Sequence, residues 1–126
     1  MNYTEFETLL RRFDGFNDSA ILSLAIDNIA ASRCDVLLRI STRDSESEFA
    51  LKEISVMLYN VGQLKVCKSQ NRNEFFLPNG GTYIFDGCDH HLELGGNGEP
   101  KIVSEMQNED VYVRFKSFML VAVSEL

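Results

Sequence analysis

The sequence lacks tryptophan, and its 126 residues include only two prolines and three cysteines. Cys34, Cys67 and Cys88 are odd in number and widely spaced, so they match neither a disulfide framework nor a CxxC metal or redox pair. We therefore expect all three cysteines to be reduced thiols.

Long hydrophobic segments are also missing. The first residues show no basic stretch followed by an apolar one, as a secretory signal would. The longest apolar run, Phe118 to Val123, has six residues, whereas a membrane helix needs about 18. The sequence therefore predicts a cytoplasmic protein that does not bind a membrane.

Positive charge is scarce. The chain has 12 Lys and Arg against 19 Asp and Glu, which gives a net charge of −7 and a pI of about 4.7. Its densest basic group, Lys65, Lys68 and Arg72, lies among polar neighbours and is typical of a solvated face. Because nucleic acids and anionic membranes are bound by clustered Lys and Arg, we expect no nucleic-acid partner.

The composition is that of a globular protein. Hydrophobic residues make up 44% of the chain and charged residues 25%, and a domain of this length buries roughly two-thirds of its unfolded surface. The strongest break is the loop Gly95 to Pro100, and too few residues follow it to form a second core. Residues 1–126 are therefore expected to form one domain.

The first segment has the pattern of a helix. Phe6, Leu9 and Phe13 fall at helical spacing, and Thr4 with Glu7 matches a capping box. The helix is expected to end at Asp14-Gly15.

The rest of the chain alternates with a period of two, as strands do. Such segments are 22–26, 36–40 and 111–115, and residues 49–66 are interpreted as strand rather than helix. Pro78 to Gly81 predicts a hairpin turn between 75–77 and 82–85. The predicted fold is α+β and mainly β, with the N-terminal helix packed on an antiparallel sheet or sandwich of about seven to nine short strands.

One polar segment contains both histidines. In an extended conformation, one side would carry Asp86, Cys88 and His90, and the other Asp89, His91 and Glu93. Either side could supply three ligands to a zinc-type ion, although HExxH and paired CxxC motifs are absent. A thiol enzyme is disfavoured because same-side residues on a strand lie about 7 Å apart. We expect no catalytic residues and no cofactor.

Acidic residues gather in two loops. The first group is Asp44, Glu46, Glu48 and Glu53, and the second is Glu105, Glu109 and Asp110. They form either solvated loops or an acidic surface that meets a basic protein, since complementary charge speeds encounter and sets specificity.

Two patterns resemble small β-rich bacterial proteins, some of them grouped with immunity proteins against polymorphic toxins. The patterns are Phe16-Asn17-Asp18-Ser19-x-Ile21-Leu22 and Ile54-x-Val56-x-Leu58-x-x-Val61-x-x-Leu64. Such families usually have His at the position of Asn17. The resemblance implies a non-enzymatic inhibitor that binds a basic toxin stoichiometrically.

Two alternatives follow from the residues themselves. One is a metal-binding or small-ligand-binding protein that uses Asp86 to Glu93. The other is a self-associating protein whose apolar end, Phe118 to Val123, pairs at a sheet edge to form a homodimer.

Overall fold

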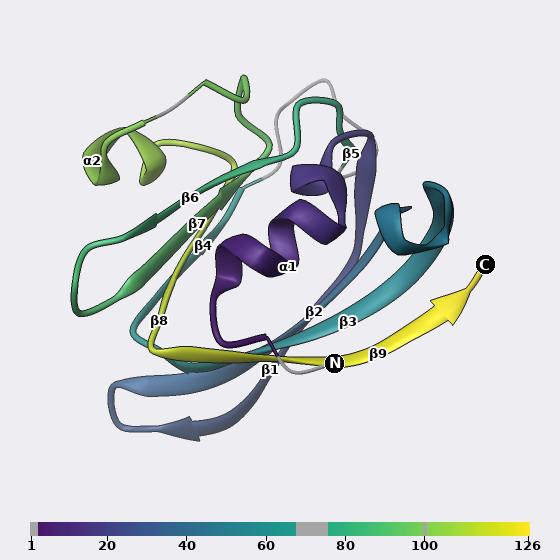
Figure 1. Cartoon of the computed structure of the whole chain (residues 1–126). Helices are drawn as coiled ribbons and strands as arrows, with labels where there is room; N and C mark the ends of the chain where they lie inside the picture. Colours follow the sequence, from purple (N-terminus) through teal and green to yellow (C-terminus); the bar gives the residue numbers. More distant parts are fainter. Residues whose placement is uncertain (1–2, 68–75, 100) are drawn as a thin grey trace.

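The structure is a computed structural model and describes residues 3–67, 76–99 and 101–126 (Figure 1). Its strands are β1 (Ser19–Ala30), β2 (Arg33–Asp44), β3 (Ala50–Val61), β4 (Gln63–Val66), β5 (Phe76–Leu77), β6 (Gly81–Phe85), β7 (His90–Leu94), β8 (Val111–Phe115) and β9 (Ser117–Glu125). The helices are α1 (Phe6–Arg12) and α2 (Val103–Met106), with short 3-10 turns η1 (Asp14–Phe16) and η2 (Ser45–Ser47). Neither α-helix in the described ranges is long and apolar enough to cross a membrane.

The strands form two antiparallel sheets. One has the order β5-β1-β2-β3-β9 and the other β4-β8-β7-β6. The sheets meet at a bend, where β3 continues into β4 and β8 into β9. There the Gly62 N–H donates to the Arg114 carbonyl and the Lys116 N–H to the Tyr59 carbonyl, each at 3.0 Å. The prediction of a mainly β, α+β fold of short antiparallel strands with a packed N-terminal helix is confirmed.

Helix α1 lies between the two sheets (Figure 1). It has seven residues, too few to be stable without tertiary packing. The fully buried Phe6 holds it there, because its ring centroid lies 5.1 Å from that of Tyr83 and 4.9 Å from that of Phe118. The predicted capping box is wrong: the N-cap residue is Glu5, and its side chain makes no capping hydrogen bond.

The core is built from alternate residues of the central strands. Inward-facing positions include Leu38 and Ile40 on β2, and Ile54, Val56 and Leu58 on β3. Leu38 pairs with Val56 and Ile40 with Ile54, so the two strands turn the same face to the core. The interpretation of residues 49–66 as strand rather than helix is confirmed, because they form β3 and β4.

The hairpin predicted at Pro78 to Gly81 is wrong, and Phe75 lies outside the described residues. Strand β5 pairs with β1, in the other sheet, whereas β6 pairs with β7. Gly80 explains the difference: its φ is +69°, and a Cβ there would lie 2.2 Å from the Gly15 carbonyl oxygen. The glycine therefore lets the chain pass tightly against η1 as it crosses between sheets.

Candidate functional site

A groove runs between α1 and β6. It consists of two adjoining hollows of about 300 and 310 Å³, both lined by Glu7 and Tyr83. The remaining lining residues are Glu5, Leu10, Arg11 and Phe85. We call this the α1–β6 groove; the packing of Phe6 on Tyr83 positions its two walls.

The aromatic wall is half-buried and lies within the field of two carboxylates. Burial, then the charges of Glu7 and Glu5, raise the pKa of Tyr83 to about 12. The Tyr83 hydroxyl lies 2.6 Å from Nδ1 of His90, and the neighbouring Phe85 is 53% exposed. Within the described part of the chain, neither Glu5 nor Glu7 forms an ion pair.

This arrangement suits a cation. A guanidinium or ammonium group is attracted both to the face of an aromatic ring and to a nearby carboxylate. The Arg11 side chain at the rim donates to the Thr8 hydroxyl at 3.3 Å and not to either glutamate. The groove is therefore a candidate site for a positively charged side chain.

The first predicted acidic group is mostly engaged within the protein. Asp44 is buried and ion-paired with Arg12, and Glu46 lies 2.5 Å from the same guanidinium. Glu53 pairs with Arg39. Glu48 is exposed and forms no ion pair among the described residues.

The second predicted acidic group lies elsewhere. Glu105 accepts the Ile102 N–H at 3.0 Å at the start of α2, and Glu109 and Asp110 are half-buried beyond it. In Figure 1, α2 and the η2 loop lie at opposite sides of the molecule. The two groups therefore form separate surfaces and not one acidic patch.

The Asp86 to Glu93 segment is the β6–β7 turn and strand β7. Asp86 accepts the N–H groups of Cys88 and Asp89 and lies 2.7 Å from His91 Nε2. The Asp89 N–H, then the His91 contact, hold the pKa of Asp86 well below its usual range. His91 also contacts the buried Tyr112 hydroxyl at 2.7 Å.

The other members of this segment also have partners within the protein. Cys88 and Asp89 lie 3.2 and 2.6 Å from the Lys116 ammonium. Glu93 is buried, which raises its pKa, and accepts from the Thr82 hydroxyl at 2.8 Å. The adjacent histidines point apart, as expected for a strand, with His90 stacked 5.0 Å from Phe115.

Within the ranges that the structure describes, no group of three or more His, Cys, Asp or Glu side chains is arranged to hold a metal ion. The six predicted ligands, Asp86, Cys88, His90, Asp89, His91 and Glu93, instead have hydrogen-bonding, ion-pairing or stacking roles.

The sequence did not predict the α1–β6 groove. The alternation of Tyr83 and Phe85 places both rings on one face of a strand and was visible in the sequence. Their meeting with Glu5 and Glu7 depends on how α1 packs, for which the sequence has no local signal.

Comparison with models of protein families, with curated proteins and with solved structures found no match to this chain.

Proposed function

We propose that this protein is a non-enzymatic binding protein whose α1–β6 groove accepts a Lys or Arg side chain of a basic partner protein. The observation that carries the proposal is the position of Glu5 and Glu7, without ion pairs among the described residues, beside Tyr83 and Phe85. Two carboxylates neutralise the entering cation while the rings contact its flat face or its alkyl stem.

The overall charge supports the same kind of partner. A net charge of −7 attracts a basic protein from a distance and raises the association rate at low salt. An immunity-type inhibitor of a basic toxin would use this chemistry, and the patterns at 16–22 and 54–64 resemble such proteins. Stoichiometric inhibition requires no catalytic residues.

A tetra-arginine peptide is a suitable probe. Titration followed by NMR should shift the signals of Glu7, Tyr83 and Phe85, and Glu5→Gln with Glu7→Gln should weaken binding about tenfold at low salt. The matched control is Glu48→Gln with Glu99→Gln, which removes the same charge from exposed positions elsewhere. Equal weakening in both double variants would show a bulk charge effect and contradict the groove.

Strand β9 favours a second candidate function, self-association. It is one of the two outer strands of the five-stranded sheet and has nine residues, and neither charge nor proline occurs from Ser117 to Ser124. Met119 and Val121 are each 50% exposed. Edge strands usually carry Lys or Pro that prevent pairing with another chain, so an uncharged edge of this length is suited to pair with a second copy.

A further inference from the structure

A second, chemically different hollow lies where the β1–β2 turn meets the bend between β3 and β4. It has a volume of about 300 Å³, and three basic residues, Arg33, Arg114 and Lys116, line it. Asp89 is its one acidic residue among the described residues. We call it the cationic cleft. Its charge is opposite to that of the chain as a whole.

The two arginines of the cleft differ from the other described basic residues in their side-chain partners. Other described Lys and Arg side chains donate hydrogen bonds or form ion pairs, as Arg12 does with Asp44 and Lys65 with the Gln107 carbonyl. Within the described ranges, Arg33 and Arg114 have no such side-chain partner. Because both arginines line the hollow, an anion bound in it would be attracted by two positive charges.

The Arg114 side chain packs beside the backbone of the bend. Its guanidinium lies against Gly62, where a Cβ would be 2.9 Å from Nη2 and 3.4 Å from Nε. The backbone of the same glycine donates to the Arg114 carbonyl at 3.0 Å. The absence of a side chain at Gly62 therefore leaves the space that the Arg114 guanidinium occupies at the cleft.

The acid in the cleft is already neutralised. Asp89 Oδ1 lies 2.6 Å from the Lys116 ammonium, so this pair adds little net charge. The two guanidiniums remain, and their forked donors match the oxygens of a carboxylate or phosphate group.

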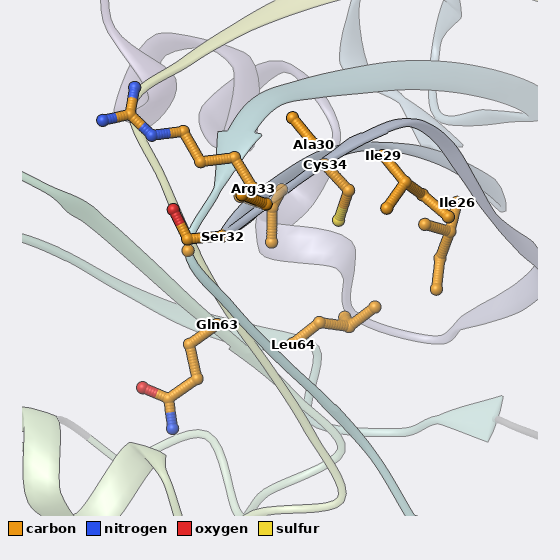
Figure 2. A pocket seen from close by; sticks show the side chains of 11 residues that line it. Ile26, Ile29, Ala30, Ser32, Arg33, Cys34, Gln63 and Leu64 are labelled. Atoms are coloured by element: carbon orange, nitrogen blue, oxygen red, sulfur yellow. The ribbon is translucent and has the colours of Figure 1, made fainter.

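An apolar hollow of about 250 Å³ adjoins the cleft and shares Arg33 and Gly62 with it. In Figure 2, Ile26, Ile29 and Leu64 lie to one side of Arg33, whose guanidinium points away from them. Ile29 is 79% exposed and Ile26 55%, so an apolar group that covered them would remove apolar surface from water. The apolar and cationic hollows therefore adjoin, with Ser32, Arg33 and Gly62 lining both.

We propose that these two hollows together bind a small organic anion in which a carboxylate or phosphate group is joined to a short apolar chain. The anionic group lies between Arg33 and Arg114, and the chain covers Ile26 and Ile29. This site is separate from the α1–β6 groove and does not depend on the function proposed for it.

Octanoate and octyl phosphate are the probes, and calorimetric titration is the measurement. At least one of them should bind, with the stronger of the two identifying the preferred anionic group. Arg33→Gln with Arg114→Gln should weaken binding by tenfold or more. Arg39→Gln with Arg43→Gln removes the same charge from β2, away from both hollows, and should leave affinity nearly unchanged. No binding of either probe, or equal weakening in both double variants, would overturn the proposal.

Two further variants test the geometry. Gly62→Ala keeps every charge but pushes the Arg114 guanidinium aside, and it should weaken octanoate binding severalfold while the melting temperature changes little. Ile29→Ser should weaken octanoate but not acetate, because acetate has no chain to cover the apolar hollow. Unchanged affinity in Gly62→Ala, or equal affinities of octanoate and acetate for the wild type, would contradict this arrangement.

Discussion

Arg12 of α1 and Asp44 at the end of β2 are joined by two parallel hydrogen bonds. Nε lies 3.0 Å from Oδ1 and Nη2 lies 3.0 Å from Oδ2. Asp44 also accepts the Glu46 N–H at 3.0 Å, and its side chain is only 1% exposed. The pair therefore ties the helix to the five-stranded sheet and closes the η2 turn.

Asp44→Asn should destabilise the protein by about 2 kcal/mol, because it removes the two charge-assisted hydrogen bonds from Arg12 at a buried position and leaves Glu46 to pair with the guanidinium. The hydrogen bond from Arg12 lowers the pKa of Asp44. The stability that ionised Asp44 contributes is therefore fully present above its unfolded pKa of about 4. This stability is lost as the pH falls further. Urea unfolding at pH 7 and pH 3 measures both effects. The control is Glu53→Gln, at the more exposed pair with Arg39, which should cost less than about 1 kcal/mol. Equal destabilisation by Asp44→Asn and Glu53→Gln would contradict a greater role for the buried pair.

Phe6→Ala should cost about 3–5 kcal/mol, since it removes a fully buried aromatic ring and leaves a cavity. The lost ring contacts Tyr83, Phe115 and Phe118, so α1 should also lose helicity. Urea unfolding and far-ultraviolet circular dichroism measure the two changes. Leu22→Ala is the control: Leu22 is 45% exposed, and its truncation should cost far less. Similar costs would argue against α1 as a packed element.

His90 should make the protein less stable in mild acid. Burial, above all other effects, lowers its pKa from the usual 6.5. Between the lowered folded pKa and 6.5, the unfolded state binds more protons than the folded state, so stability falls as the pH drops below about 6.5. His90→Gln should flatten the melting temperature between pH 7.5 and pH 5. An unchanged slope in the variant would show that His90 does not titrate in this way.

The elements of the fold were predictable where one local pattern decided them. Strand β3 has apolar residues at every second position, namely Ile54, Val56 and Leu58. This alternation predicts a strand with one face buried in the core, as the structure has it. The hairpin predicted at Pro78 to Gly81 was wrong because Gly80 instead lets the chain pass close to Gly15, which is far away in the sequence. The positive φ of Gly80 serves a crossing here and would serve a hairpin equally well, so the sequence cannot distinguish the two.

The sites were much less predictable than the fold. Acidic residues were visible in the sequence, but whether a carboxylate is free depends on which cation reaches it in three dimensions. Asp44 forms an ion pair with Arg12, 32 positions away, whereas Glu7 has no ion pair among the described residues. Likewise, Arg33 and Arg114 lie far apart in sequence and share a cleft only because the bend at Gly62 brings their strands together.

Met119→Lys tests the pairing of β9 with a second copy. Met119 pairs with Met57 at the outer edge of the sheet, so a lysine there would put like charges close together in a two-fold antiparallel dimer. We expect the wild type to form a dimer whose fraction rises with concentration, and the variant to be monomeric, by size-exclusion chromatography with light scattering. Leu22→Lys adds the same charge at an exposed position on β1, away from this edge, and should leave the dimer intact. A wild type that is monomeric at every concentration, or a dimer lost equally in both variants, would contradict the pairing.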